Sequence, residues 1–311
     1  MSVGPDGEVV LNLSGITKTF GPLVANDAIS FSLKQGEVIA LLGENGAGKT
    51  TLMNILFGHY VADAGTVTAF GKDLPKGDPQ AALNAKIGMV HQHFTLADNM
   101  TVLDNIALGT QSLFLPRFDR AKARQKIVSH AGDFGLAVDP DALIADLSVG
   151  ERQRVEILKA LYRDAQILIL DEPTAVLTPL ETEALFRTLK MLVAKGLSII
   201  FISHKLQEVM AVSDRVLVLR GGRLVGEERT ANTDRHALAS LMVGEDIQPP
   251  QISEPQSGQM NFELTEVSAS GIGTGAALKD ISLQLRAGEI TGLAGVSGNG
   301  QAALAALIAG T

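Results

Sequence analysis

The chain has 311 residues, a formal net charge of −8 and no cysteine. Its length suffices for one large or two ordinary domains, and 46% hydrophobic with 19% charged residues indicates a globular rather than a disordered protein. The acidic balance argues against a protein that coats nucleic acid, and the lack of cysteine excludes disulfides and thiolate chemistry.

The first strong motif is the glycine-rich loop GENGAGKT, which follows the aliphatic run Val38–Leu42 and opens the helical pattern Lys49–Phe57. The alternative is an ordinary glycine-rich turn. A loop of this pattern between a strand and a helix is instead typical of a phosphate-binding P-loop. Its backbone N–H groups would face phosphate oxygens, Lys49 would reach the β- and γ-phosphates, and the Thr50 hydroxyl would ligate Mg²⁺. The residues expected to bind the nucleotide here are Gly43, Glu44, Asn45, Gly46, Ala47, Gly48, Lys49, Thr50 and Thr51.

Further strands and helices alternate along the chain. Strands are expected at Ile167–Leu170, Ser198–Ile202 and Arg215–Leu219, and helices at Glu151–Tyr162 and Pro179–Ala194. This alternation predicts an α/β fold with a mostly parallel sheet covered on both faces. Residues from about 95 to 147 break the rhythm and are expected to form a helical subdomain that continues into the helix at Glu151.

Two carboxylates follow the run Ile167–Leu170. Asp171 at the strand end suits a contact with Mg²⁺ itself or with one of its ligands, and Glu172 is placed to polarise an attacking water. Two acids after an aliphatic strand are common, so this interpretation depends on the P-loop that precedes them.

The segment LSVGERQ at Leu147–Gln153 opens the next helix. Alone it predicts only a helix capped by Ser148. Beside the P-loop and the two carboxylates it resembles the signature, usually LSGGQ, of the ATP-binding subunits of ABC transporters. The resemblance implies an anion site that contacts the γ-phosphate of ATP held by the opposite domain, at Ser148, Val149, Gly150 and Glu151.

The same resemblance implies roles for three more residues. Gln92 matches the Q-loop glutamine, which touches Mg²⁺ and the nucleotide and senses the membrane partner. His204 matches the switch histidine that helps to hold the attacking water, and Phe20 stands where the family stacks an aromatic ring on adenine. The implied catalytic residues are Glu172 and His204, and the implied Mg²⁺ ligands are Thr50, Gln92 and Asp171.

A second glycine-rich loop, GVSGNGQA at Gly295–Ala302, begins 252 residues after the first (295 − 43). The same offset matches positions over about 30 residues, which indicates a tandem repeat. Gln301 and Ala302 replace Lys49 and Thr50, so the second loop lacks the cation and the Mg²⁺ ligand and is expected to be impaired in hydrolysis. Three alternatives remain open: nucleotide bound there without turnover, no nucleotide at all, or a loop that only packs its domain.

The expected organisation is a first ABC ATPase domain at residues 9–243, a linker at 244–258, and the start of a second, degenerate domain at 260–311. The second copy is expected to comprise its first strand, loop and helix and to be truncated early. In the family, one domain's P-loop pairs with the other domain's signature. Hydrolysis by this chain is therefore expected to be weak unless two chains dimerise or a second ABC domain is supplied.

The resemblance is closest to tandem-domain importers of sugars and nucleosides, and LSVGERQRVEILKAL with DEPTAVLTP is nearest to nucleoside importers. It implies ATP hydrolysis that powers solute import at the cytoplasmic face of the membrane. Implied partners are transmembrane permease subunits and, through them, a solute-binding lipoprotein, without nucleic acid. The alternative is a soluble ABC protein that acts on ribosomes, a class that usually has a charged helical linker and two intact P-loops.

Three positions depart from the wider family pattern. Val149 and Glu151 replace the usual glycine and glutamine of the signature, and Thr178 stands where many ABC proteins have an aspartate in the D-loop. These changes predict asymmetry between the two nucleotide sites.

Overall fold

The computed structural model describes residues 7–110, 119–244, 258–271, 276–295 and 298–310. The chain divides into two compact units, Met1–Ile247 and Gln248–Thr311. This division lies within the segment predicted as a linker, of which residues 245–257 are outside the described residues.

The first unit is built around a six-stranded sheet. Its strands are β3 (Val38–Leu42), β6 (Ile87–Val90), β7 (Ile167–Asp171), β8 (Ser198–Ser203), β9 (Arg215–Arg220) and β10 (Arg223–Arg229). They lie in the order β10-β9-β3-β8-β7-β6, and all neighbours are parallel except the edge pair β10 and β9. β3, β7 and β8 are buried along their whole length, as unbroken aliphatic runs are in a sheet covered on both faces. The predicted parallel α/β sheet is confirmed.

Side chains on the two faces of this sheet enter different cores, because successive residues of a strand point to opposite faces. In β8, Ile200 and Ile202 belong to one core, whereas Ile199 and Phe201 belong to another. The sheet therefore separates two hydrophobic layers and holds the ends of its strands in fixed positions.

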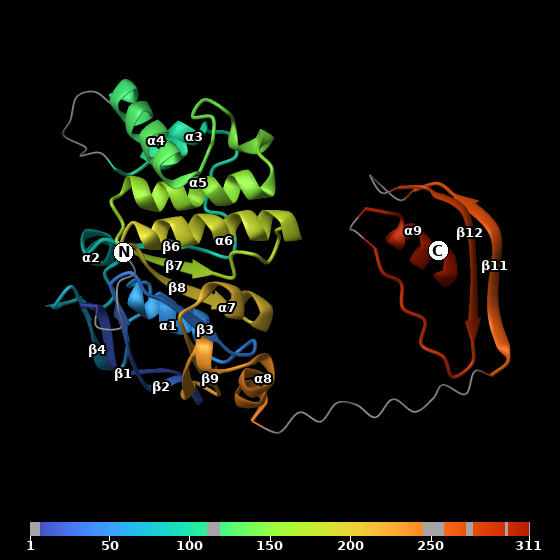
Figure 1. The fold of residues 1–311 in the computed structure, drawn as a ribbon, viewed down its shortest axis with the longest axis horizontal. Helices are drawn as coiled ribbons and strands as arrows, with labels where there is room; N and C mark the ends of the chain where they lie inside the picture. Colours follow the sequence, from blue (N-terminus) through green and yellow to red (C-terminus); the bar gives the residue numbers. More distant parts are fainter. Residues whose placement is uncertain (1–6, 111–118, 245–257, 272–275, 296–297, 311) are drawn as a thin grey trace. The chain divides into compact units, whose positions relative to one another are not determined.

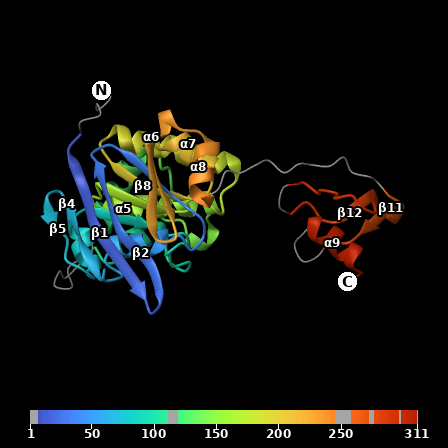
Figure 2. The same ribbon diagram turned by 90° about the horizontal axis from the view of Figure 1, so that it is seen from below.

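An antiparallel sheet, which the sequence reasoning did not predict, forms the second layer. Its strands are β1 (Val9–Phe20), β2 (Leu23–Lys34), β4 (Ala64–Ala69) and β5 (Lys72–Asp73), in the order β2-β1-β4-β5. Figure 2 shows β1 and β2 as one long hairpin along the side of the unit. Several register shifts interrupt their pairing, so the alternation of apolar and polar residues that would reveal these strands is broken.

The helices cover the parallel sheet. They are α1 (Lys49–Leu56), α2 (Pro79–Asn84), α3 (Val102–Ala107), α4 (Arg120–Phe134), α5 (Val149–Tyr162), α6 (Pro179–Ala194), α7 (Leu206–Val212) and α8 (Arg235–Val243), with short 3₁₀ turns at Ile144–Asp146 and Thr230–Asn232. α3, α4 and α5 contact one another and lie together at one end of the unit (Figure 1). They occupy the region predicted to be helical, of which residues 111–118 lie outside the described part.

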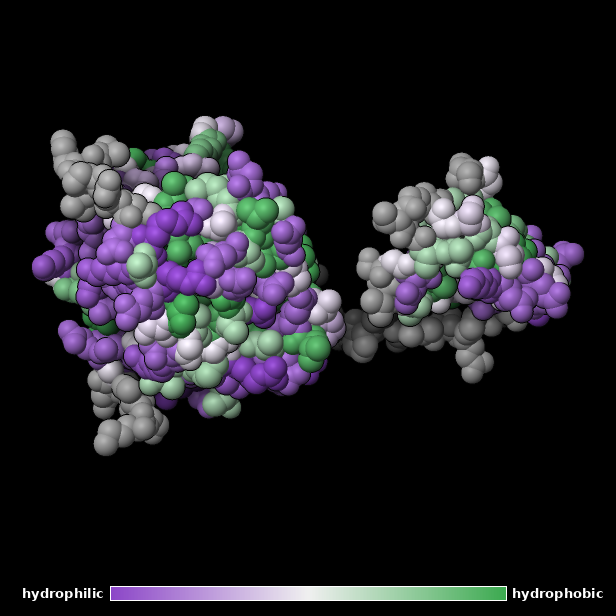
Figure 3. Space-filling view, turned by 90° about the horizontal axis from the view of Figure 1, so that it is seen from above, coloured by the Kyte–Doolittle hydropathy of each residue, from purple (hydrophilic) through white to green (hydrophobic). Residues whose placement is uncertain are grey.

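The face of the first unit seen in Figure 3 mixes polar and apolar residues. Among the large apolar side chains that are exposed, Val176 and Leu180 lie beside Thr178. No helix that the structure describes has both the length and the hydropathy required to cross a bilayer.

The second unit contains a β-hairpin and a helix. It contains β11 (Met260–Ala269), β12 (Leu278–Arg286) and α9 (Gln301–Ala309). In β1 and β2 the Gly15 N–H donates to the Ser30 hydroxyl at 2.8 Å, and in β11 and β12 the Glu266 N–H donates to the Ser282 hydroxyl at 3.0 Å. The acceptor serines are offset by 252 residues (282 − 30) and the donors by 251 (266 − 15), so the two hairpins share this irregular hydrogen bond.

One expectation for the second unit is wrong. The strand expected before its loop does not form, because residues 289–295 have no regular structure, and Ile290 is 99% exposed. In the first unit, β3 pairs with β8 on one side and β9 on the other. The described residues of the second unit provide only the β11 and β12 pair, so this segment lacks the neighbours that a central parallel strand requires.

Candidate functional site

The glycine-rich loop joins β3 to α1 and is packed tightly between two other strands. Gly48 has φ of 99° and Gly46 has φ of 84°, in the left-handed region that favours glycine. A Cβ atom at Gly48 would lie 2.2 Å from the Ala25 carbonyl oxygen on β2, and one at Gly43 would lie 2.4 Å from the Leu219 carbonyl oxygen on β9. Glycine is therefore required at Gly43 and Gly48 by the close approach of neighbouring backbone.

Lys49 is buried at the start of α1. Its Nζ donates hydrogen bonds to the carbonyl oxygens of Gly43 at 2.7 Å and Glu44 at 2.9 Å. Burial lowers its pKa, and the nearby carboxylates of Glu172 and Asp171 oppose this shift. A buried ammonium held by neutral carbonyls in a loop of backbone N–H groups is suited to an anionic ligand.

Asp171 ends β7 and is 4% exposed. Burial raises its pKa, the neighbouring Glu172 raises it further, and Lys49 lowers it. Lys49 and Asp171 thus shift each other's pKa, as expected for residues of one site.

Glu172 follows directly and is contacted by two other predicted site residues. The Gln92 Nε2 donates to one carboxylate oxygen at 3.3 Å, and the His204 Nδ1 lies 3.0 Å from the other. Glu172 also has φ of 44°, a backbone conformation that costs about 1–3 kcal/mol outside glycine and is concentrated at functional sites. Three residues from distant parts of the chain therefore converge at the ends of β6, β7 and β8.

The chemistry of these residues fits Mg²⁺ bound together with a nucleotide. The described residues contain no group of three or more His, Asp or Glu side chains that would hold a metal alone. Mg²⁺ at nucleotide sites typically uses one or two carboxylates and takes its other ligands from phosphates and water. Thr50, Gln92 and Asp171 match that pattern, with one carboxylate among them.

The signature segment starts α5, and Ser148 is its N-cap. The Ser148 hydroxyl and backbone N–H both donate to one oxygen of Glu151, at 2.8 and 2.9 Å. The Glu151 N–H donates back to the Ser148 hydroxyl at 3.3 Å, which completes a capping box. The hydrogen bond from the Ser148 hydroxyl is the main reason that the pKa of Glu151 is lowered. Val149, at the first position of the helix, is partly exposed.

Glu181, which the sequence reasoning missed, joins the signature to Thr178. One carboxylate oxygen accepts from the Gly150 N–H at 3.2 Å, and the other accepts from the Thr178 N–H and hydroxyl. The Thr178 backbone bond is the largest cause of its lowered pKa. A Cβ at Gly150 would lie 2.6 Å from this carboxylate, so a larger residue there would displace the Glu181 side chain. Thr178 and Glu181 have the spacing of a capping box, so their hydrogen bonds could have been predicted from the sequence.

Two separate groups of site residues result. Among the hydrogen bonds and ion pairs of the described residues, none joins Ser148–Glu151 to Gly43–Thr51. The loop and carboxylates form one group, and the signature with Thr178 forms the other.

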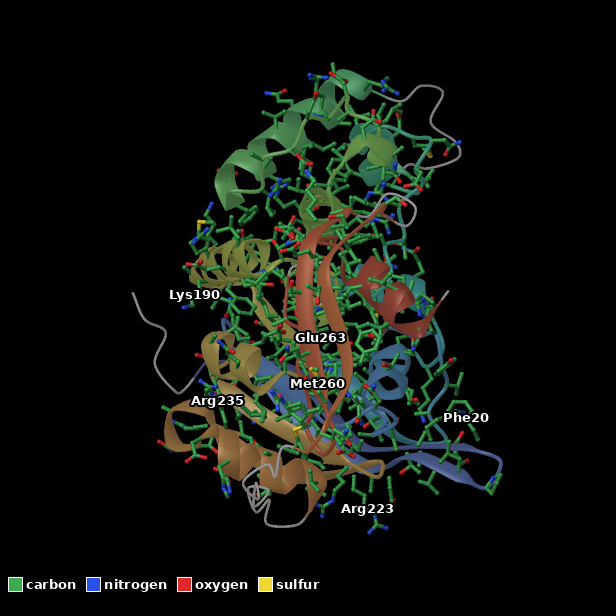
Figure 4. All side chains as sticks on the ribbon, turned by 90° about the vertical axis from the view of Figure 1, so that its right-hand side faces the viewer. Phe20, Lys190, Arg223, Arg235, Met260 and Glu263 are labelled. Carbon is green, nitrogen blue, oxygen red and sulfur yellow. The ribbon has the colours of Figure 1, made fainter. Side chains whose placement is uncertain are left out.

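Phe20 lies at the end of β1, where Figure 4 shows it at the edge of the first unit. Phe20 is 44% exposed, and the Tyr60 ring packs edge-on against its ring with centroids 5.7 Å apart. Tyr60 follows α1 in the chain, so this aromatic pair joins the end of β1 to the segment after α1. Tyr60 was not singled out from the sequence, because a lone aromatic after a helix carries no motif.

The second loop retains the backbone of the first in its described part. Gly298 and Gly300 both have φ of 91°, close to the values at Gly46 and Gly48. The Gln301 Nε2 lies 2.6 Å from the position of a Cβ at Gly295, so this amide approaches the loop where Lys49 does in the first copy. Residues 296–297 lie outside the described part.

Comparison with known proteins gives consistent matches. The family model described as ABC transporter matches residues 26–175. The chain is 46% identical over 306 residues to the nucleoside import ATP-binding protein NupA of Lactococcus lactis, and 44% identical over 332 residues to the glucose import ATP-binding protein TsgD13 of Haloferax volcanii. Both alignments cover 97% of this chain, which spans 60% of the length of each relative.

Among solved structures, the chain is similar to an ATP-binding cassette of an ABC transporter in its ADP conformation. The TM-score is 0.68 and the identity 27%, over 76% of this chain and 100% of that one.

Proposed function

The chain belongs to the ATP-binding proteins of the ABC transporter family, and from this premise we propose that it binds ATP at Gly43–Thr50 and hydrolyses it to power solute import. The observation that carries this proposal is the convergence of Gln92 and His204 on Glu172, beside the buried Lys49 and Asp171.

Each residue of this group has a role in the proposed reaction. The loop N–H groups and Lys49 bind the β- and γ-phosphates, and Phe20 offers an exposed ring for adenine. Glu172 accepts a proton from the attacking water, and His204 orients that carboxylate. The strained backbone at Glu172 keeps its carboxylate at the end of β7.

Mg²⁺ would be held by Thr50 and Gln92, with Asp171 behind them or in direct contact. When bound, it supplies positive charge that neutralises the phosphate oxygens. Burial raises the pKa of Asp171 and so disfavours its negative charge. The nearby Lys49 lowers this pKa and so favours the charge.

The signature group is proposed to serve a different nucleotide. Ser148, Val149, Gly150 and Glu151 would face the γ-phosphate bound by a second ABC domain or by a second copy of this chain.

We predict that the two nucleotide sites of the assembled protein are asymmetric. The site built on Lys49 is expected to perform the hydrolysis, because Gln301 and Ala302 provide neither the cation nor the Mg²⁺ ligand. Measuring ATP turnover after Lys49→Ala and after Gln301→Ala separates the sites. The first change should abolish turnover and the second should leave most of it, whereas equal losses would contradict the asymmetry.

The partners are proposed to be transmembrane permease subunits at the cytoplasmic face of the membrane, served by a solute-binding lipoprotein. NupA is named for nucleoside import and TsgD13 for glucose import, so the proposed cargo is a nucleoside or a sugar.

Affinity purification of the tagged protein from membranes tests the importer role. Recovery of a permease that stimulates its ATP turnover would support the proposal. Sedimentation with ribosomes and no permease would instead favour a soluble ABC protein that acts in translation.

A further inference from the structure

Asn26 lies on β2 directly beneath the glycine-rich loop and is fully buried. Its Nδ2 donates a hydrogen bond to the Gly48 carbonyl oxygen at 3.1 Å. Among the residues that the structure describes, none provides a hydrogen-bond partner for its Oδ1. An unpaired buried acceptor destabilises a folded protein, so a polar residue retained here needs a reason other than stability.

The bond to Gly48 has a geometric consequence for the loop. The Gly48 carbonyl also accepts from the Leu52 N–H at 3.0 Å, so two donors fix its direction. Because a trans peptide is planar, its carbonyl and the following N–H point in opposite directions. Fixing the Gly48 carbonyl therefore fixes the Lys49 N–H, which is one of the N-terminal helix donors that have no partner within the helix.

The second copy provides an internal comparison. Leu278 occupies the position equivalent to Asn26, at the same offset of 252 residues (278 − 26), and it is also buried. A Cβ at Gly300 would lie 3.1 Å from the Leu278 Cδ2, as a Cβ at Gly48 would lie 2.7 Å from the Asn26 Nδ2. The two side chains thus fill the same space beneath equivalent glycines, one with a donor and one without.

The polar Asn26 lies beneath the loop that contains Lys49 and Thr50. The apolar Leu278 lies beneath the loop that has Gln301 and Ala302 in their place. A residue needed only to fill this space would be better served by leucine in both copies, because leucine leaves no buried acceptor unpaired.

We propose that Asn26 is a positioning residue of the ATP site, which holds the Gly48 peptide so that the Lys49 N–H faces the phosphates. This inference rests on the proposed function, because it assigns a role in the site at Gly43–Thr50. Loss of the Asn26 Nδ2 donor is therefore expected to weaken nucleotide binding without lowering the stability of the fold.

The test is Asn26→Leu, which places the residue of the second copy beneath the first loop. Calorimetric titration with ATP and Mg²⁺ should show a Kd raised about threefold to tenfold, the effect of one hydrogen bond. The Tm should be unchanged or higher, because the unpaired Oδ1 is removed. An unchanged Kd would overturn the proposal.

Ile29→Val is the matched control, because Ile29 lies on the same strand and is buried without contacting the loop through a polar atom. It should lower the Tm and leave the Kd as in the wild type. Equal losses of affinity in Ile29→Val and Asn26→Leu would mean that Asn26 only packs the core. If Asn26→Leu does not fold, Asn26→Val, which also lacks a donor, is measured against the same expectation.

Lys49→Ala in the same titration tests the proposed function separately. If it abolishes binding while Asn26→Leu binds normally, the ATP site stands and only the role of Asn26 is lost. If the wild type does not bind ATP, the proposed function itself fails.

Discussion

Replacing Glu172 with glutamine is expected to slow ATP hydrolysis about 100-fold to 10,000-fold while preserving ATP binding. Glutamine keeps the shape of the side chain and can still contact Gln92 and His204, but it cannot accept a proton from water. Phosphate release by the assembled transporter measures turnover, and titration of the chain with ATP measures binding.

Glu183→Gln is the control for this prediction, because that carboxylate lies on α6 and its side chain is 68% exposed. It should leave turnover unchanged. Full turnover in Glu172→Gln would remove Glu172 from the proposed role, and loss of ATP binding would indicate a structural one.

Replacing Gly48 with alanine is expected to destabilise the first unit by about 2–6 kcal/mol, the combined cost of left-handed backbone and overpacking. The new Cβ would lie 2.2 Å from the Ala25 carbonyl oxygen, so either β2 or the loop must move. Because the loop N–H groups would move with it, ATP binding should also be lost. Urea denaturation and ATP titration measure the two effects.

Gly46→Ala is the matched control within the same loop. Gly46 has φ of 84°, but no described atom lies within 4 Å of the position of its Cβ. It should therefore show only the backbone strain of about 1–3 kcal/mol. Equal destabilisation by the two substitutions would mean that the contact with β2 is not tight.

The parallel sheet of the first unit was predictable because its strands are uninterrupted aliphatic runs. β3 coincides with the predicted Val38–Leu42, and α6 with the predicted Pro179–Ala194. The β1 and β2 hairpin was not predictable, because its register shifts disrupt the period of two. The strand expected before the second loop failed for another reason. A central parallel strand depends on partners elsewhere in the chain, and local sequence does not reveal whether they are present.

The candidate site was predictable where its residues belong to motifs. Gln92, Glu172 and His204 are separated by up to 112 residues (204 − 92), and the structure brings them within hydrogen-bond distance. Asn26 was not predictable in the same way, because it acts through a contact between two layers of the fold.

The most direct test of the ATP site is calorimetric titration of this chain with ATP and Mg²⁺, compared with its Lys49→Ala variant. Lys49 is the buried cation of the intact loop, and its removal leaves the phosphates without a fixed positive charge. We predict saturable binding by the wild type and its loss in Lys49→Ala, with the Tm of the unliganded protein retained. Equal affinity of the two proteins for ATP would contradict it.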